Sequence, residues 1–557
     1  MSGPTAYTPQ GFDVPIDLDL SKNEGRSRAE ALVASIEDPQ RLVAHYPDTS
    51  ALRARLAALH GVGMDRVLVT AGGDDALARC FMARVGPGGQ VVTTYPTFEM
   101  IPRYAEQRRA ELVEVPWWTG PLPVPELVEA IGDQTNAVFI VSPNNPTGGT
   151  ATEVELLKLA EESPLLVLDA AYVEFADIDP TPALLELPNV VVARTLSKAY
   201  GLAGLRVGYL LGPAELVASI GAYGNPYPVS ALSSAIATIR LDRPQEELTS
   251  FVEEVRAERV QLTGVLAGLG ARPLPSEGNF VLAETDEAAW VVAAAASLGV
   301  GLRRFADRPG LEGAVRITLP GGRDDFERLV ATLGAALAPE AIIFDLDGVI
   351  ADVSRSQILA IIETARSFGV DIGPDDIETA KGEGDTSDDW ALTRALCRRA
   401  GVETDLTEVT ARFETLYQGD GRTPGLKVAE TALVDQERWQ RWASRFPLAV
   451  VTGRPRIDAE EFLERFGLAE ALAALVTRDE APLKPDPTPV RLALETMGVS
   501  RAWMLGDTPD DLSAARAAGV VPIGVIAPGD DSAKARHRLR AAARILDRTT
   551  DLEEMLR

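Results

Sequence analysis

Short apolar segments alternate with amphipathic stretches along almost the whole chain, and they fall into two series. Each apolar segment is rich in Val, Ile or Leu and is followed by a turn that carries Gly, Pro, Asn or Asp. Strands that alternate with helices in this way form parallel α/β sheets. The strands expected in the first series are 66–70, 90–93, 137–141, 165–169, 190–194 and 206–211, and those in the second are 341–345, 448–452, 474–477, 503–507 and 522–525.

The border between the two series predicts two domains. A chain of 557 residues exceeds what one hydrophobic core supports. The series meet at residues 337–340, where no Gly/Ser-rich spacer occurs, so we expect domains 1–338 and 339–557, docked with restricted mutual motion. Between the first two strands of the second series lies a mostly helical stretch. We interpret it as an inserted cap at about 356–444, within a core formed by 339–355 and 445–557.

The overall composition excludes several classes of function. The formal net charge of −28 argues against a nucleic-acid partner. With three histidines and two cysteines, neither a histidine-centred site nor a disulfide framework is expected. The first residues lack the basic start and apolar core of a signal peptide, and the longest apolar stretch is too short to span a bilayer. We therefore expect a cytoplasmic protein with no membrane partner.

The segment RTLSKAYGLAGLRVGY places Lys198 just after a predicted buried strand. Burying an unpaired ammonium group is costly, and a Schiff base with an aldehyde cofactor removes that cost. Arg206, in the same segment, is placed to face a phosphate group. The alternative interpretation is that Lys198 is a solvated loop lysine.

Residues upstream favour the cofactor interpretation. Asp169 ends a predicted strand and can pair with a protonated pyridine nitrogen, while Tyr172 and Asn145 can bind the phenolic oxygen of the same ring. Phe98 follows another strand and can stack on the ring face. The AGGDDA turn at 71–76 offers free amides at a helix start, which bind phosphate. Each residue alone also has an ordinary role as a turn former, helix cap or core aromatic, but the set occurs in the order that a cofactor cradle needs.

With these motifs, residues 1–338 resemble the fold-type-I pyridoxal-phosphate aminotransferases, and RTLSKAYGLAGLRVGY and DAAYVEF are most similar to histidinol-phosphate aminotransferase. The resemblance implies a large mixed-sheet domain at about 45–225 and a small α/β domain from 1–44 and 226–338. It implies that Lys198 forms the Schiff base with pyridoxal 5'-phosphate and moves the substrate proton. Tyr46 would reach the phosphate of a neighbouring subunit, so a homodimer is implied. The other cofactor-binding residues that it implies are Gly73, Asp74, Asn145, Asp169, Tyr172, Thr195, Ser197 and Arg206.

Substrate-binding residues follow from the same resemblance. Arg316, in VRITLP, matches the arginine that grips a carboxylate or phosphate of the substrate, and a bidentate guanidinium suits either anion. Arg304 matches a second anion-binding arginine of the histidinol-phosphate branch. Asn23 and Glu24 form the family's Asn-Glu pair, but the Pro and Gly that normally follow are missing. This segment closes over the substrate, so the identity of the substrate stays open.

The segment EAIIFDLDGVIAD places Asp345 and Asp347 at the end of an apolar strand. Neighbouring carboxylates repel each other unless a divalent cation or a shared proton relieves them. The D-x-D-G-V motif resembles the haloacid-dehalogenase superfamily, a Rossmann-like fold with a helical cap. The resemblance implies that Thr452 binds the transferring phosphoryl group, that Lys484 offsets its charge, that Asp507 binds metal, and that Asp511 or Asp510 supports the metal site. Each motif alone is also compatible with a capped strand end.

The residue at position 347 decides the reaction class. An aspartate there can protonate a leaving alcohol and then deprotonate water, so the resemblance implies phosphoryl transfer through an aspartyl-phosphate on Asp345. Mg²⁺ would be held by Asp345, Asp507 and the backbone carbonyl of Asp347. The insertion resembles the cap of phosphoglycolate-phosphatase-like enzymes and favours small-molecule phosphates. Residues 381–390 are the candidate specificity loop, or alternatively an exposed acidic connector.

These signals together predict a bifunctional enzyme. We expect glutamate-dependent transamination of imidazole acetol phosphate to L-histidinol phosphate, followed by hydrolysis to L-histidinol and phosphate. Three alternatives stay open at this stage. The same chemistries can act on another amino-alcohol phosphate, the first half can be a threonine-phosphate decarboxylase, or the second half can be a regulatory module without turnover.

Overall fold

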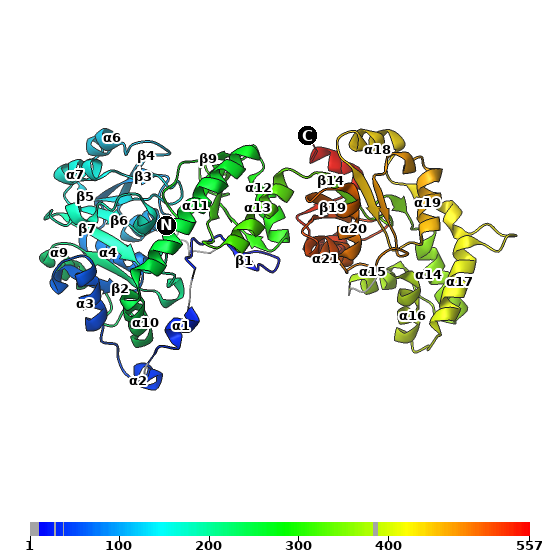
Figure 1. The fold of residues 1–557 in the computed structure, drawn as a ribbon, viewed down its shortest axis with the longest axis horizontal. Helices are drawn as coiled ribbons and strands as arrows, with labels where there is room; N and C mark the ends of the chain where they lie inside the picture. The colour runs from blue at the N-terminus through cyan, green and yellow to red at the C-terminus, as the bar shows by residue number, and fades with distance from the viewer. Residues whose placement is uncertain (1–9, 27–28, 37, 383–387, 557) are drawn as a thin grey trace. The chain divides into compact units, whose positions relative to one another are not determined.

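The protein is described by a computed structural model that covers residues 10–26, 29–36, 38–382 and 388–556. The chain divides into two compact units (Figure 1). The first comprises Met1–Gln10, Asp19–Ala288 and Leu302–Arg328, and the second comprises Gly11–Leu18, Ala289–Gly301 and Leu329–Arg557. Within the described residues, no helix is both long enough and apolar enough to cross a membrane.

A seven-stranded sheet forms the centre of the first unit, with the strand order β2-β8-β7-β6-β5-β3-β4. Strands β7, β6, β5, β3 and β4 run parallel. Every residue of β7 is buried, as expected for a strand that is covered on both faces. The bounds are β2 (Val67–Thr70), β3 (Gln90–Tyr95), β4 (Glu111–Pro116), β5 (Thr135–Val141), β6 (Leu166–Asp169), β7 (Val190–Thr195) and β8 (Gly208–Leu211).

Strand β8 departs from the parallel pattern, because it runs antiparallel to both β7 and β2. The connection from β7 to β8 holds the Lys198 segment and the short 3-10 helix Ala203–Leu205 in place of a full crossover helix. The helices of this unit are α1 (Ala29–Val33), α2 (Pro39–Ala44), α3 (Ser50–Leu59), α4 (Gly73–Arg84), α5 (Met100–Arg108), α6 (Val124–Glu129), α7 (Glu153–Glu162), α8 (Thr181–Leu184), α9 (Ala214–Gly221), α10 (Ala231–Asp242) and α11 (Gln245–Gly268).

A smaller antiparallel sheet carries the substrate arginines that the sequence predicts. Its order is β12-β13-β10-β9, formed by β9 (Arg272–Pro273), β10 (Phe280–Glu284), β12 (Arg303–Arg304) and β13 (Ala314–Thr318). A two-stranded pair joins β1 (Leu18–Asp19) to β11 (Val300–Gly301). These strands were not among those expected from the sequence.

The second unit has a six-stranded, fully parallel sheet with the order β18-β17-β14-β19-β20-β21. Every strand expected from the sequence is present in the two large sheets, with ends shifted by at most two residues. The strands are β14 (Ala341–Phe344), β17 (Leu448–Val451), β18 (Ala474–Val476), β19 (Ala502–Gly506), β20 (Val521–Val525) and β21 (Arg544–Leu546), and the helices around them are α18 (Gln436–Ala443), α19 (Arg456–Arg465), α20 (Thr488–Met497), α21 (Pro509–Ala517) and α22 (Ser532–Arg538).

The expected helical cap is formed by α14 (Gln357–Ser367), α15 (Pro374–Gly382), α16 (Asp389–Arg399) and α17 (Leu406–Gln418), which group together in Figure 1. Apolar residues of all four helices pack into a cluster of their own. Two connections join cap and core, and they pair as the antiparallel strands β15 (Ala351–Asp352) and β16 (Thr431–Ala432). Helix α18 packs into the core, where Trp439 and Trp442 contact Phe344.

The second unit also contains segments that precede residue 339. Helix α12 (Ala288–Ser297) and the end of α13 (Arg323–Leu337) cover one side of its sheet. The indole nitrogens of Trp290 and Trp503 donate to the carbonyls of Ala336 and Ala335, at 2.8 and 2.9 Å, and the two rings lie 5.0 Å apart. The domain border at residue 339 therefore stays a prediction, while the compact unit reaches further back along the chain.

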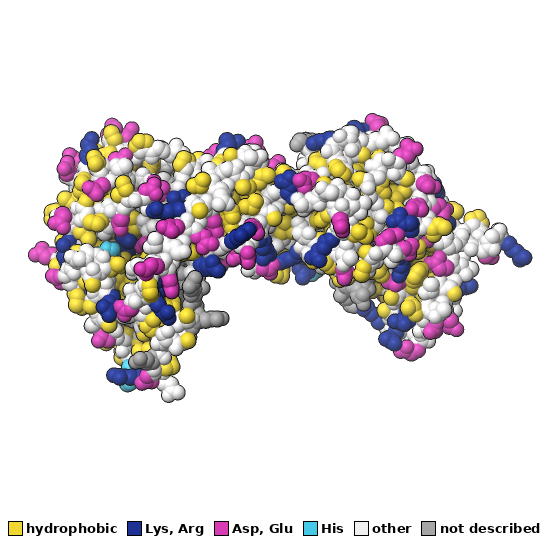
Figure 2. Space-filling view, in the orientation of Figure 1, with side chains coloured by type: hydrophobic (Ala, Val, Ile, Leu, Met, Phe, Trp, Pro, Cys, Tyr) yellow, Lys and Arg dark blue, Asp and Glu magenta, His cyan; other side chains and the backbone are white. Residues whose placement is uncertain are grey.

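Acidic side chains are spread over the visible face of each unit and do not gather in one patch (Figure 2). The net charge of −28 is therefore distributed over the surface of each unit. An anionic ligand would therefore have to be attracted by local groups, against an unfavourable overall field.

Candidate active sites

A cavity of about 570 Å³, including its open mouth, lies beside the parallel strands of the first unit. Because the carboxyl ends of parallel strands meet at one edge of a sheet, residues that follow β5, β6 and β7 converge there. The cavity brings together most of the cofactor-binding residues predicted from the sequence. Its lining comprises Gly73, Asp74, Phe98, Asn145, Asp169, Ala171, Tyr172, Thr195, Ser197, Lys198 and Arg206.

Lys198 lies in the connection between β7 and β8 and extends its ammonium into this cavity. Nζ donates to the backbone oxygen of Lys22 at 3.1 Å and lies 5.5 Å from the centre of the Tyr172 ring. Burial, helped by the positive charge of Arg316, lowers the pKa of Lys198 to about 8. A lysine with this pKa has a large neutral fraction near pH 8, as an amine that attacks an aldehyde requires.

Asp169 is the last residue of β6 and is buried. Burial raises the pKa of its carboxyl group to about 7, against the effect of the Ala171 amide, which donates to Oδ1 at 3.1 Å. A buried carboxylate of this kind is stabilised by a cation placed against it. The protonated nitrogen of a pyridine ring is such a cation, so Asp169 fits the predicted role.

The hydroxyl of Tyr172 is the meeting point of a buried hydrogen-bond network. Nδ2 of Asn145 and Nδ2 of Asn23 both donate to it at 3.2 Å. Arg316 donates to Oδ1 of Asn145 at 2.6 Å and to the backbone oxygen of Ser21 at 2.7 Å. Asn23, which adopts a positive φ of 55°, also exchanges hydrogen bonds with Thr318. Predicted cofactor and substrate residues thus share one network.

The other end of the cavity is suited to an anion. Helix α4 begins at Gly73, and its first amides point toward the cavity edge that Thr195 and Ser197 also line. Arg206 adopts a positive φ of 53° and forms an ion pair of 2.8 Å with Asp74. Hydroxyls, helix amides and a guanidinium form the donor set that a phosphate group requires, so pyridoxal phosphate fits both ends of the cavity.

The strand register separates the two neighbouring arginines of β12. Arg303 lies opposite Arg316 on β13, whereas Arg304 lies opposite Val315. Paired residues of an antiparallel sheet project from the same face, so Arg303 shares the face of Arg316. The guanidinium carbons of both lie within 6 Å of the Phe305 ring centre, at 5.5 and 5.8 Å. Arg303 was not predicted from the sequence, because a shift of one residue along a strand moves a side chain to the other face. The role of Arg304 stays a prediction.

Tyr46 does not line this cavity in its own chain. Its ring is 81% exposed and stacks on Tyr227 at 4.6 Å. An exposed pair of stacked tyrosines is compatible with the predicted reach into a neighbouring subunit, which is not part of this structure.

In the second unit, Lys484 is the centre of a buried ion cluster at the carboxyl ends of the strands. Its Nζ lies 2.6 Å from Oδ1 of Asp345 and 2.5 Å from Oδ1 of Asp511. Although burial opposes its charge, these two carboxylates raise the pKa of Lys484 well above the ordinary value. Burial raises the pKa of Asp345 well above its ordinary range, against the pull of Lys484. The ammonium and the carboxylates therefore stabilise each other in a site that solvent hardly reaches.

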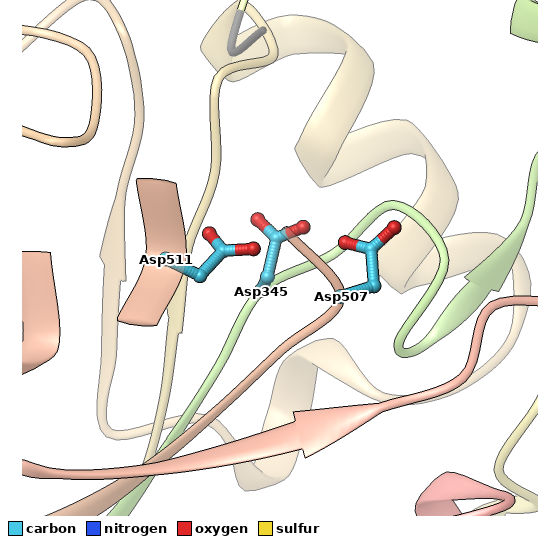
Figure 3. Close-up of side chains that lie close together, drawn as sticks. All are labelled: Asp345, Asp507 and Asp511. Atoms are coloured by element: carbon cyan, nitrogen blue, oxygen red, sulfur yellow. The ribbon is translucent and has the colours of Figure 1, made fainter. Parts of the chain in front are cut away.

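Three carboxylates here can hold a metal ion. Oxygens of Asp345, Asp507 and Asp511 all lie within 4.8 Å of one another. Figure 3 shows Asp345 between the other two, with the three groups on the same side of the strand ends. An all-oxygen donor set is what Mg²⁺ prefers, so the residues fit this ion. Gly348 permits the arrangement, because it has a φ of 76° and a Cβ there would lie 2.6 Å from Oδ2 of Asp507.

Asp347 and Thr452 lie beside the ion cluster. Asp347 is held by Arg454, whose Nε and Nη2 donate to Oδ1 at 2.8 and 2.5 Å. Thr452 follows β17, and its Oγ1 accepts from the amide of Arg454 at 3.1 Å. Asp347 lines the same cleft as Asp345, and Thr452 directly follows Val451, whose backbone oxygen accepts from Nζ of Lys484 at 3.1 Å. Arg454 is a site residue that was not predicted from the sequence.

A cleft of about 760 Å³, including its open mouth, joins the predicted catalytic aspartates to the cap. Trp390 and Glu414 line the cap side, and the guanidinium of Arg478 lies 4.3 Å over the Trp390 ring. Residues 383–387 of the predicted specificity loop lie outside the described residues. The cap thus supplies the walls of the cleft and the core supplies the reactive groups.

Comparison with known proteins identifies both halves. Residues 15–333 match the model of the family described as aminotransferase class I and II. The chain belongs to this family. Residues 342–525 match the family described as haloacid dehalogenase-like hydrolase, so the chain joins an aminotransferase to a hydrolase domain. The predicted fold class is confirmed, and the aminotransferase fold implies pyridoxal phosphate as cofactor.

Individual relatives resemble the first half. An aromatic amino acid aminotransferase of Corynebacterium jeikeium is 40% identical over 305 residues, which cover 52% of this chain and 81% of the relative. A histidinol-phosphate aminotransferase of Xanthomonas euvesicatoria is 35% identical over 319 residues, covering 55% and 88%. The crystal structure of histidinol-phosphate aminotransferase from Sinorhizobium meliloti in complex with pyridoxal-5'-phosphate has a TM-score of 0.53 and 26% identity, covering 58% and 91%.

The lowered pKa of Lys198 predicts its reactivity in cofactor-free aminotransferase. Reductive methylation between pH 6 and 10, followed by peptide mass spectrometry, should modify Lys198 with a midpoint near pH 8. Arg316→Gln should move the midpoint to higher pH, because it removes a positive charge that disfavours the ammonium form. Exposed Lys158 is the internal reference. A Lys198 profile that coincides with that of Lys158 would contradict the prediction.

The Lys484 cluster predicts a variant whose stability depends on magnesium. Lys484→Met leaves Asp345 and Asp511 without their common cation, at a cost of about 3–5 kcal/mol in the free energy of unfolding. Added Mg²⁺ should recover part of this loss, since it supplies positive charge to the same carboxylates. Urea unfolding with and without Mg²⁺ measures both effects. Lys427→Met, which removes the pair with exposed Glu461, is the control. Equal Mg²⁺ responses in the wild type and in Lys484→Met would count against the idea.

Proposed function

We propose that the chain converts imidazole acetol phosphate and glutamate into L-histidinol phosphate and 2-oxoglutarate, and then hydrolyses L-histidinol phosphate to L-histidinol and phosphate. The observation that carries the proposal is that predicted site residues gather in two cavities of one chain, one around Lys198 and one around Asp345. The similarity of the first half to histidinol-phosphate aminotransferases supports the choice of substrate. The hydrolase then acts on the phosphate ester that the first site produces.

In the aminotransferase, the residues divide the work between binding and proton transfer. Bound pyridoxal phosphate supplies an electron sink for the carbon that exchanges its amino group. Asp169 holds the pyridinium nitrogen, and Tyr172 and Asn145 hold the phenolic oxygen. Nζ of Lys198 moves the proton that leaves the amino-bearing carbon. Arg316 grips the carboxylate of glutamate, or the phosphate of the other substrate, through two parallel N–H groups.

In the hydrolase, Asp345 and Asp347 act in turn. The carboxylate of Asp345 attacks phosphorus, the bond between phosphorus and the ester oxygen breaks, and Asp347 gives its proton to the departing alcohol. Asp347 then takes a proton from a water molecule that attacks phosphorus, which releases phosphate and restores the carboxylate of Asp345. Lys484 and Thr452 hold the phosphoryl oxygens during both steps. Mg²⁺ held by Asp345 and Asp507 offsets the negative charge.

Two single variants separate the two activities. Lys198→Ala should abolish phosphate release from imidazole acetol phosphate plus glutamate and leave release from histidinol phosphate unchanged. Asp345→Asn should abolish phosphate release from both and leave 2-oxoglutarate formation intact. Mass spectrometry of the products and a phosphate assay measure these outcomes. If Lys198→Ala still releases phosphate from the ketone, or the wild type does not hydrolyse histidinol phosphate, the proposal is wrong.

A second candidate for the first half is transamination of aromatic amino acids. It is favoured by the 40% identity to an aromatic amino acid aminotransferase. Phenylalanine and tyrosine lack a phosphate, so this function would leave the hydrolase without a product to act on. A comparison of kcat/KM for phenylalanine and for histidinol phosphate as amino donors decides between the two candidates.

We also propose that the active aminotransferase is a homodimer in which Tyr46 completes the site of the neighbouring subunit. The 81% exposure of Tyr46 and its stacking on Tyr227 support this, because a second copy would cover an aromatic surface that is otherwise open to water.

The strand register predicts which arginine binds the second anion of the phosphorylated substrate. Arg303→Met should raise KM for histidinol phosphate by about 10- to 100-fold, because it removes the guanidinium that shares the face of Arg316 and that would donate to the second anion in place of its pair with Glu99. Arg304→Met, the adjacent control, should change KM by less than about 3-fold, because that side chain projects from the other face. Steady-state kinetics with glutamate and histidinol phosphate measure both. A larger rise in KM for Arg304→Met than for Arg303→Met would show that Arg304 binds the second anion.

A further inference from the structure

Arg454 is a buried arginine in the VVTGRP segment, between β17 and α19, and its guanidinium joins two carboxylates. Nε and Nη2 donate to Oδ1 of Asp347 at 2.8 and 2.5 Å. Nη1 and Nη2 donate to the two oxygens of Glu430 at 3.0 and 3.2 Å. The side chain is 4% exposed, and that of Glu430 is 3% exposed. A single planar group therefore links the predicted acid–base residue to Glu430, out of reach of water.

The partners of Glu430 belong to the segments that connect cap and core. Glu430 directly precedes β16, which pairs with β15 of the other connection. Its Oε1 accepts from Oγ of Ser356, just before α14, at 2.8 Å and from the hydroxyl of Tyr417, in α17, at 3.0 Å. Nη1 of Arg454 also donates to the Tyr417 hydroxyl, at 3.0 Å. The segments that connect cap and core, residues 351–356 and 430–432, are called the hinge of the cap below. The same guanidinium thus contacts this hinge and the side chain of Asp347.

The two hydrogen bonds from Arg454 fix one carboxylate oxygen of Asp347. Both Arg454 donors that reach Asp347 meet Oδ1, so this oxygen is held against Arg454 and Oδ2 receives neither of these two hydrogen bonds. Asp347 also lines the cleft. Guanidinium groups are planar and rigid, so they transmit orientation better than a single ammonium does. An acid–base residue works only when its reacting oxygen is within hydrogen-bond reach of the group that takes the proton.

We propose that Arg454 is a positioning residue of the hydrolase. It orients Asp347 toward the ester oxygen, and its contacts with Glu430 and Tyr417 couple this orientation to the position of the cap. The inference rests on the proposed phosphatase function. In the first step, a proton passes from Asp347 to the ester oxygen as the bond from that oxygen to phosphorus breaks and the bond from Asp345 forms. Arg454 touches none of these atoms and acts through Asp347.

The test compares two leaving groups. An alkyl ester needs a proton from Asp347, whereas 4-nitrophenolate leaves without one. Arg454→Met should lower kcat/KM for histidinol phosphate by about 100-fold and for 4-nitrophenyl phosphate by less than about 5-fold, because kcat/KM reports the step in which the leaving group departs. The kcat/KM of Arg454→Lys for histidinol phosphate should lie between the values for Arg454→Met and the wild type. In an Asp347→Asn background, Arg454→Met should have less than about a 2-fold effect, because the group that it orients is gone.

Two further variants guard against a loss of folding. Glu430→Gln keeps the shape of the hinge residue and weakens its hold on Arg454, so it should lower the ratio of alkyl to nitrophenyl activity in the same direction. Arg465→Met is the matched control. Arg465 is exposed and donates to backbone oxygens of the same connecting segment, those of Lys427, Val428 and Glu430, at 3.3, 2.8 and 3.4 Å. These bonds leave the Glu430 carboxylate, which holds Arg454, untouched. It should leave both activities within about 2-fold of the wild type.

The outcomes separate this inference from the proposed function. Equal losses on both esters, an undiminished effect in the Asp347→Asn background, or no effect of Arg454→Met would overturn the positioning role. If the wild type cleaves 4-nitrophenyl phosphate but not histidinol phosphate, the proposed substrate is wrong. Phosphoethanolamine then replaces histidinol phosphate as the alkyl ester in the test of Arg454. If the wild type cleaves no phosphomonoester, both proposals fail.

Discussion

The need to compensate buried charge governs both sites of this chain. Parallel strands end at one edge of a sheet, and polar residues that follow them are brought together there with little water. In the hydrolase, the ammonium of Lys484 between Asp345 and Asp511 compensates the carboxylates from within the protein. In the aminotransferase, the carboxyl group of Asp169 has its pKa raised to about 7 by burial and is suited to an external cation. The first site is therefore built to receive a charged ring. The second holds one ammonium against three carboxylates, so a metal ion would supply the positive charge that is still missing.

The same principle explains why the motif residues were easy to find in the sequence. Asp169, Asp345 and Asp507 each end or directly follow an apolar strand, and a charged residue at that point is conspicuous. Strand positions were predicted to within two residues because the alternation of apolar and polar segments is strong in both large sheets. These local signals sufficed for the two families, which the comparisons confirm.

Contacts between residues that are far apart in the chain could not be predicted from the sequence. Arg303 and Arg304 are identical neighbours, and only the register of β12 on β13 shows which one shares a face with Arg316. The link from Arg454 to Glu430 joins a strand-end turn to the hinge of the cap and has no local signature. The antiparallel direction of β8 likewise depends on how the Lys198 connection folds back, which composition does not encode.

The covering of the hydrolase sheet by earlier segments affects how the chain is made. Trp290 and the carbonyls of Ala335 and Ala336 belong to the compact unit whose sheet contains Trp503. During synthesis the chain emerges from its N-terminus, so the apolar face around Trp290 stays open to solvent until β19 has left the ribosome. Completion of the second unit thus waits until the strands from β14 to β21 have been synthesised, long after Trp290.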